Sequence, residues 1–255
     1  MLVDSSDSVV SEKIMSEGSW QPQLIYLISK LVHPGDTVLN LGSQTGMEAI
    51  VIGRIIGERG RMFIFEPYSI SYRLMVKNIY LNGLNTVTKT YRLAAGIGSA
   101  KKMLNIDRRN TGHSSVVKEG SAMSINYEEI MIVAVDEIVP NSTGIDFGLI
   151  DVEDYQVEAL LGMKELLKRS PKCILVVEWG GYALKSDLNM RELAEELLKW
   201  ISRQGFKWYR YFGADDPCKI THIEEVDSME LMSIRVEDLI LVGPQADVSH
   251  LFKSS

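Results

Sequence analysis

The chain has 255 residues, of which 45% are hydrophobic and 24% are charged, and its formal net charge at pH 7 is −7. This composition is typical of a chain with a packed core and argues against intrinsic disorder. The negative charge and the lack of a Lys/Arg cluster argue against a nucleic-acid-binding surface, so no nucleic-acid partner is expected.

The start of the chain lacks the features of a targeting segment. Residues 1–20 have neither a basic start nor an apolar run, and no window reaches the length of a membrane span. The two cysteines, Cys173 and Cys218, do not suggest a disulfide framework, which indicates a reducing compartment. We therefore expect a cytoplasmic chain with no membrane span.

Apolar periodicity divides the chain into alternating strands and helices. Residues 1–18 are rich in Ser, Asp and Glu and are expected to form a mobile leader before a single domain over 19–255. Helical spacing of apolar residues predicts a helix over 21–32. The strands that follow are predicted over 37–42, 61–67, 86–96, 130–139, 145–152 and 172–179, and helices over 47–56, 69–84 and 190–204. A further helix is predicted after the strand over 145–152, with Val157, Leu160, Leu161, Leu166 and Leu167 on its buried side.

This alternation implies a parallel sheet with helices on both faces. The final strands, 206–212 and 238–243, have no helix between them and are expected to pair antiparallel. Residues 97–129 interrupt the alternation, and short β-like runs around a polar stretch predict a small inserted β-hairpin there. The predicted fold is an α/β, seven-stranded Rossmann-like sheet, mostly parallel, with an antiparallel last strand.

The first strand ends in a glycine turn. Gly42 allows a sharp turn, and Gly46 allows the next helix to begin close to a ligand. The spacing is not the Gly-x-Gly-x-x-Gly of dinucleotide-binding folds, and glycines in such a turn also occur for structural reasons alone. Glu66 ends the second strand, where a carboxylate can accept both hydroxyls of a ribose or cap the next helix. Together these features favour a ligand of the nucleoside type.

Carboxylates follow two predicted neighbouring strands. Asp151 and Glu153 come directly after one strand, and Glu178 ends the next. Carboxylates that converge at one sheet edge raise one another's pKa, which favours a general base or a divalent cation site. Asp154 is expected only to cap the following helix. His113, in the inserted segment, is a minor candidate for a base, although a single loop histidine is more often solvated.

From Gly18 to Gly180 the sequence resembles the FkbM-type family of S-adenosylmethionine-dependent methyltransferases. Six motifs occur in the family's order, and some positions depart from it, such as Asn40 in place of an aspartate. The motifs are "GSWQP" (18–22), "NLGSQTG" (40–46), "FEP" (65–67), "KNIYLNGL" (77–84), "LIDVEDYQVEALLGM" (149–163) and "ILVVE" (174–178), joined by the Gly/Ser segment "NTGHSSVV" (110–117).

The resemblance implies methyl transfer from S-adenosylmethionine, commonly to a hydroxyl of a sugar or glycan, a polyketide or another metabolite. Glu66 would hold the ribose, the glycine turn the methionine end, and Asp151 would lie beside the methyl group. The residues expected at the cofactor are Gln21, Asn40, Gly42, Ser43, Gln44, Gly46, Glu66, Pro67, Ala95 and Asp151. Those expected at the reaction are Asp151, Glu153, Glu178 and His113, with a divalent cation as an option.

Two alternatives remain open on the sequence. Gln21, Asn40 and residues 154–156 differ from the family pattern, which also fits a catalytically degenerate module that binds cofactor or a protein partner. An NAD-dependent oxidoreductase is disfavoured by the glycine spacing and by the terminal antiparallel strands. The acceptor and the oligomeric state are not predicted.

Overall fold

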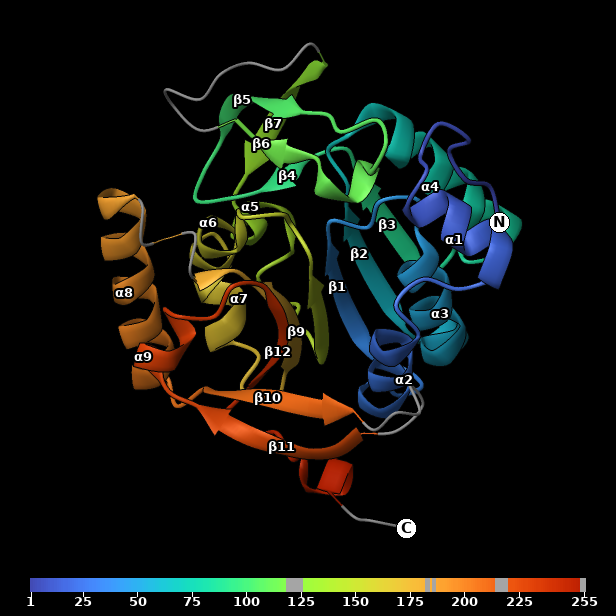
Figure 1. The fold of residues 1–255 in the computed structure, drawn as a ribbon. Coiled ribbons are helices and arrows are strands. Elements are labelled where there is room, and N and C mark those ends of the chain that lie inside the picture. The colour runs from blue at the N-terminus through green and yellow to red at the C-terminus, as the bar shows by residue number, and fades with distance from the viewer. Residues whose placement is uncertain (118–125, 182–183, 185–186, 214–219, 253–255) are drawn as a thin grey trace.

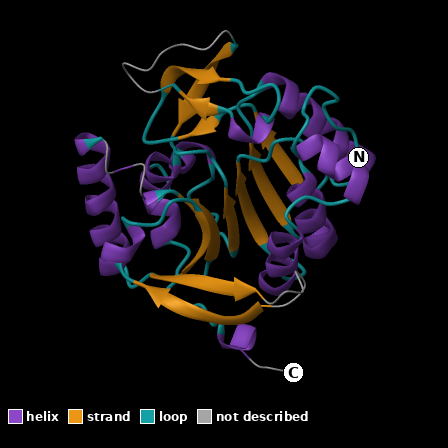
Figure 2. Ribbon diagram, viewed as in Figure 1, coloured by secondary structure: helices purple, strands orange, loops and turns teal. Residues whose placement is uncertain are grey.

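The computed structural model describes residues 1–117, 126–181, 184, 187–213 and 220–252 (Figure 1). A central sheet has helices on both faces, and a smaller sheet lies at one end of it (Figure 2). This is the predicted Rossmann-like α/β architecture.

The central sheet has eight strands. In spatial order the strands are β11 (Ile220–Val226), β10 (Lys207–Gly213), β12 (Glu237–Val242), β9 (Ile174–Trp179), β8 (Phe147–Ile150), β1 (Thr37–Leu41), β2 (Arg61–Phe65) and β3 (Thr88–Tyr91). The five strands from β9 to β3 in this order are mutually parallel, and the other three pair antiparallel with their neighbours.

The prediction of seven strands was wrong by one. The predicted antiparallel pairing of the final strands is confirmed as the β10–β12 pair, but β11 adds an edge strand beside β10. Most residues of β11 are exposed or half-buried, so the segment lacks the apolar run of a central strand. Its pairing with β10 comes from tertiary structure, and local hydrophobicity does not reveal it.

Each face of the sheet packs against its own set of helices. Along β1, Val38 contributes to one core, and Leu39 and Leu41 contribute to the other, because successive strand residues point to opposite faces. One face is covered by α2 (Pro22–Leu31), α3 (Met47–Ile56) and α4 (Ser69–Leu81), and the other by α5 (Val135–Ile138), α6 (Gln156–Leu161), α7 (Lys164–Lys168), α8 (Leu188–Arg203) and α9 (Ser228–Leu231). Single turns of 3₁₀ helix occur as η1 (Gly57–Arg59), η2 (Thr111–His113) and η4 (Ser249–Phe252).

The inserted segment contains two short antiparallel strands where the sequence predicted them, but it is not confirmed as a simple hairpin. It belongs to a second, four-stranded sheet in which β5 pairs antiparallel with both β6 and β7. The run predicted as one strand over 130–139 is divided between β7 and α5. Residues 118–125 of the predicted hairpin lie outside the described residues. The strand order is β4 (Ala94–Ala95), β7 (Tyr127–Val133), β5 (Ala100–Asn105) and β6 (Ser115–Val116).

Residues 1–18, the predicted leader, contain a helix and contact the rest of the protein. Helix α1 (Val10–Glu17) is followed by Gly18, whose φ of 75° is the left-handed conformation common after a helix. Asp7, ahead of this helix, is 1% exposed. The mobility of the segment stays a prediction. None of the helices in the described part of the chain is long and apolar enough to cross a membrane.

Candidate active site

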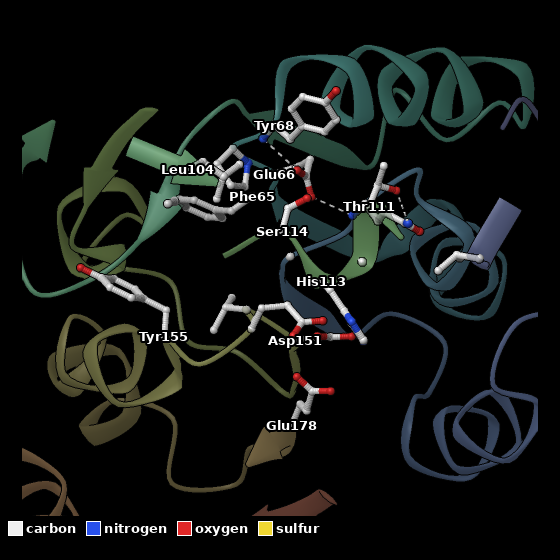
Figure 3. A pocket seen from close by; sticks show the side chains of 18 of the residues that line it. Phe65, Glu66, Tyr68, Leu104, Thr111, His113, Ser114, Asp151, Tyr155 and Glu178 are labelled. Carbon is white, nitrogen blue, oxygen red and sulfur yellow. Dashed lines mark hydrogen bonds between the residues drawn. The ribbon is translucent and has the colours of Figure 1, made fainter. Parts of the chain in front are cut away.

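A cavity of about 330 Å³ lies at the carboxyl ends of β1, β2, β8 and β9 (Figure 3). Residues from the small sheet, from the loop around η2 and from the start of α1 complete its walls. In parallel α/β sheets, ligands bind at the carboxyl ends of the strands, and the volume is in the range of small-molecule sites. The fold therefore places the cavity where a cofactor site is expected.

Most of the predicted site residues line this cavity. They are Gln21, Gly42, Gln44, Glu66, Pro67, Ala95, His113, Asp151, Glu153 and Glu178. Asn40, Ser43 and Gly46 do not line it. Asn40 and Ser43 are buried, and the Asn40 Nδ2 donates a hydrogen bond to the Ser43 Oγ at 3.3 Å. This hydrogen bond joins β1 to the glycine turn that follows it.

The glycine turn lies against the end of β8. Gly42 has a φ of +79°, and a β-carbon at this position would lie 1.6 Å from the carbonyl oxygen of Asp151. Gly46, with a φ of +85°, precedes α3, and a β-carbon there would lie 2.9 Å from the Met75 Cγ. Both positions need glycine for backbone conformation and for close packing. The glycines at positions 42 and 46 therefore have a structural role, which the sequence analysis had left as one of two explanations.

Glu66 is held by backbone groups from two loops. Its Oε2 accepts a hydrogen bond from the Gln44 N–H at 2.8 Å, and its Oε1 accepts one from the Tyr68 N–H at 2.9 Å. The residue is 6% exposed, and burial raises the pKa of Glu66 to about 7 although both hydrogen bonds lower it. Each carboxylate oxygen has a second lone pair. Glu66 can therefore still accept hydroxyl groups of a ligand.

Three carboxylates meet at the opposite side of the cavity. Oxygen atoms of Asp151, Glu153 and Glu178 lie within 4.8 Å of one another, a spacing that would also suit a metal ion. Burial, followed by the charge of Glu178, raises the pKa of Asp151 well above its usual range. Burial also raises the pKa of Glu153 to about 8 and that of Glu178 to about 7. A side-chain hydrogen bond with Asp151 lowers the pKa of Glu178, so the pair can share a proton.

Strained backbone is concentrated at the cavity. Four non-glycine residues have a positive φ within the described part of the chain: Gln21 (44°), Gln44 (47°), Glu153 (44°) and Asp154 (62°). The first three line the cavity. Such conformations cost about 1–3 kcal/mol each and persist where surrounding contacts hold them, which is typical of functional sites. The prediction that Asp154 caps the next helix was wrong, because α6 begins after Tyr155 with no side-chain cap.

His113 reaches the cavity from the other wall. It belongs to η2, is exposed, and lines the cavity with Asp151 (Figure 3). The structure thus brings the predicted minor base candidate to the same cavity as the carboxylates. Its role stays a prediction.

Other residues in the cavity wall or beside it escape sequence reasoning. Glu48, in the first turn of α3, lines the cavity, and burial raises its pKa to about 7. Asp238 of β12 pairs in register with Glu178, and burial raises its pKa to about 6. Thr111 of η2 also lines the cavity. The position of Glu48 six residues after Gly42 was a signal that could have been used, but the position of Asp238 depends on strand register.

A model of the methyltransferase FkbM domain matches residues 41–208, which is more than half of the chain. The chain belongs to this family. The matched region includes Gly42, Glu66, Asp151 and Glu178, and it begins after Gln21 and Asn40. The resemblance drawn from the motifs is thereby confirmed.

This FkbM-domain chain is similar to solved structures of methyltransferases. An O-methyltransferase from Bacillus cereus, solved in complex with SAH, is 12% identical with a TM-score of 0.50, and the alignment covers 95% of this chain and 92% of that chain. The O-methyltransferase TomG from Streptomyces achromogenes, involved in tomaymycin synthesis and solved with SAM, is 12% identical with a TM-score of 0.49, covering 95% and 90%. No curated protein matches the chain. The FkbM domain and this fold are those of an S-adenosylmethionine-dependent methyltransferase.

Proposed function

We propose that this chain transfers the methyl group of S-adenosylmethionine to a hydroxyl oxygen of a small-molecule or glycan acceptor. The observation that carries the proposal is the carboxyl pair Asp151–Glu178, which lies in the same cavity as the glycine turn and Glu66. One side of the cavity can hold a nucleoside, and the other can take a proton from an acceptor.

The residues on the glycine-turn side fit the cofactor. Glu66 offers two fixed carboxylate oxygens to the ribose hydroxyls, and the turn at Gly42 offers a close backbone approach to the methionine end. Apolar side chains beyond Glu66 form a surface for a flat purine base. They are Phe65, Tyr68, Ala94, Ala95, Leu104 and Val116.

The charge of the cavity also suits the cofactor. Its described lining includes five carboxylates and neither Lys nor Arg. Bound S-adenosylmethionine supplies an electrophilic methyl group on a positively charged sulfonium. A nearby positive charge lowers carboxylate pKa values, so Glu153 and Glu178, whose pKa values are about 8 and 7 in the free protein, would ionise more readily in the complex.

Asp151 is the proposed general base, and Glu178 accepts a share of its proton. A hydroxyl loses its proton as its oxygen bonds to the methyl carbon, and a carboxylate in hydrogen-bond reach can take that proton. The cofactor would supply the methyl group and keep the electron pair of the carbon–sulfur bond on sulfur, and the Asp151–Glu178 pair would take the proton that the acceptor hydroxyl loses, so charge would balance. Orientation of the acceptor opposite the sulfur supplies much of the remaining rate.

A divalent cation held by Asp151, Glu153 and Glu178 is a second arrangement of the same site, favoured by the spacing of their oxygens. Thermal unfolding with and without Mg²⁺ separates the two. A cation site gives an increase in Tm with Mg²⁺ that is lost in Asp151→Asn. A proton-sharing pair gives methyl transfer that continues in EDTA.

Calorimetry with S-adenosylmethionine and S-adenosylhomocysteine, followed by a methyl-transfer assay over hydroxyl-bearing acceptors, tests the function. We expect binding of both compounds and transfer to at least one acceptor. Absence of binding contradicts the proposal. Binding without transfer to any acceptor supports the degenerate module suggested by Gln21 and Asn40.

A further inference from the structure

The N-terminal segment forms part of the cavity wall. Val9 and Val10 line the cavity beside Asn110 and Thr111 of the η2 loop. Ser8 makes two polar contacts with this loop, because its backbone N–H and its side-chain hydroxyl both donate to the Arg109 carbonyl, at 2.9 and 3.2 Å. The segment and the loop therefore form one continuous wall.

Asp7 is the buried centre of this wall. The residue is 1% exposed. The Oδ1 atom accepts hydrogen bonds at the start of α1 from the backbone N–H groups of Val9 (2.9 Å), Val10 (2.8 Å) and Ser11 (3.3 Å). A buried carboxylate is stable only when hydrogen bonds replace its hydration. These three donors satisfy the hydrogen-bonding needs of one of the two carboxylate oxygen atoms.

The second oxygen of Asp7 faces the η2 loop and the glycine turn. The Oδ2 atom accepts hydrogen bonds from the Thr111 N–H at 3.0 Å, from the Thr111 hydroxyl, and from the Gln44 Nε2 at 3.4 Å. Gln44 also donates to the Thr111 hydroxyl at 2.7 Å. The carboxylate thus joins three segments that are far apart in the sequence.

Gln44 continues the connection to the proposed ribose site. Its side chain bonds Asp7 and Thr111, and its backbone N–H donates to Glu66 at 2.8 Å. The φ of +47° at Gln44 is costly for a residue with a side chain, so surrounding contacts must hold this conformation. Loss of the side-chain bonds would favour relaxation of the turn and would move the N–H away from Glu66.

We propose that Asp7 is a positioning residue for cofactor binding, which acts through Thr111 and Gln44 on the turn that fixes Glu66. This inference depends on the proposed function, because it assumes that the cofactor occupies the turn and Glu66. It assigns to the N-terminal segment a role in affinity for the cofactor, and by linkage the bound cofactor also holds the segment in place.

The experiment measures affinity for S-adenosylhomocysteine by calorimetry, well below the Tm of each variant. We expect Asp7→Ala to bind about 10-fold more weakly or worse, within the usual range of coupling between sites. Asp4→Ala is the matched control, because Asp4 carries the same charge in the same segment and its side chain accepts hydrogen bonds from Ser6, with no such bond to Thr111 or Gln44 in the described part of the chain. The control should bind as the wild type does.

A second pair of variants covers the case in which Asp7→Ala does not fold. Thr111→Val removes the hydroxyl between Asp7 and Gln44 at nearly constant volume, and Thr111→Ser keeps it. We expect Thr111→Ser to bind S-adenosylhomocysteine more tightly than Thr111→Val. Equal affinities of the two variants contradict the inference.

Proteolysis supplies an independent readout. S-adenosylhomocysteine should slow tryptic cleavage after Lys13, in α1, in the wild type and not in Asp7→Ala. A folded Asp7→Ala that has a lower Tm but wild-type affinity shows a merely structural role and overturns the inference. If the wild type itself binds no S-adenosylhomocysteine, the proposed function fails, and this inference fails with it. The two failures are thus distinguishable.

Discussion

The carbonyl oxygen of Asp151 occupies the space that a side chain at Gly42 would need. A β-carbon on Gly42 would lie 1.6 Å from that oxygen, and the φ of Gly42 is +79°. The ends of β1 and β8 therefore meet in direct backbone contact. This contact places the proposed cofactor turn beside the proposed general base, so that one site can serve binding and chemistry.

Gly42→Ala should destabilise the protein severely. The clashing atom belongs to the backbone and cannot rotate away, so β1 and β8 must separate at their ends. We expect a loss of about 4 kcal/mol or more in the free energy of unfolding, measured by urea denaturation. Gly98→Ala is the control, because a β-carbon there has no neighbour within 4 Å and its φ is not positive. A loss below about 1 kcal/mol in Gly42→Ala would contradict the packing described.

Glu66→Ala should weaken cofactor binding. The substitution removes the proposed acceptor of the ribose hydroxyls and leaves the N–H groups of Gln44 and Tyr68 without their partner. Hydrogen bonds to charged groups contribute about 1.5–3 kcal/mol, so the Kd for S-adenosylhomocysteine should rise about 10-fold to 100-fold. Calorimetry checks this, and Glu58→Ala, at an exposed position in η1, serves as control. Unchanged affinity would remove Glu66 from the cofactor site.

Asp151→Asn should show the opposite pattern. The side chain keeps its shape but can no longer take a proton, so kcat should fall about 100-fold or more, whereas the Kd for S-adenosylhomocysteine stays close to that of the wild type. Steady-state assays and calorimetry on the same preparation separate the two effects. Normal turnover would show that Asp151 is not the base.

The pH dependence of the wild-type rate provides a second check on this base. The value of kcat/KM reports ionisations of the free enzyme, and the carboxyl groups must lose protons to act. Because the pKa of Glu178 is about 7 and that of Glu153 about 8, kcat/KM should rise with pH through this range. A value of kcat/KM that does not change between about pH 6 and about pH 9 would contradict the assignment of these carboxyl groups.

Stability should fall as pH rises across the same range. The pKa values of Glu66, Glu153 and Glu178 are about 7, 8 and 7 in the folded protein and near 4.5 when unfolded. The folded state therefore binds more protons than the unfolded state between these values, and its advantage is lost as pH rises through the folded pKa. Tm should decrease from pH 5 to about pH 8.5, with a smaller decrease in Glu178→Gln. A Tm that rises over this interval would contradict the buried carboxyl cluster.

The sequence predicted the parts of the site that depend on strand ends. Gly42, Glu66, Asp151 and Glu178 each follow or end an apolar run, and the carboxyl ends of parallel strands meet at one edge of a sheet. Local sequence patterns were therefore enough to predict that these residues lie close together. The same patterns missed β11, because an exposed edge strand has little apolar signal.

By itself, the sequence determined the alternation of strands and helices, the family, and the position of Glu66, Asp151, Glu153 and Glu178 at the cavity, since each follows from local periodicity or from a short motif. Only the tertiary structure decided that Asp7 lies against Thr111, 104 positions further along the chain, and that Asp238 lies beside Glu178. These contacts depend on the path of the chain between distant segments and on strand register, and neither leaves a pattern in the neighbouring residues.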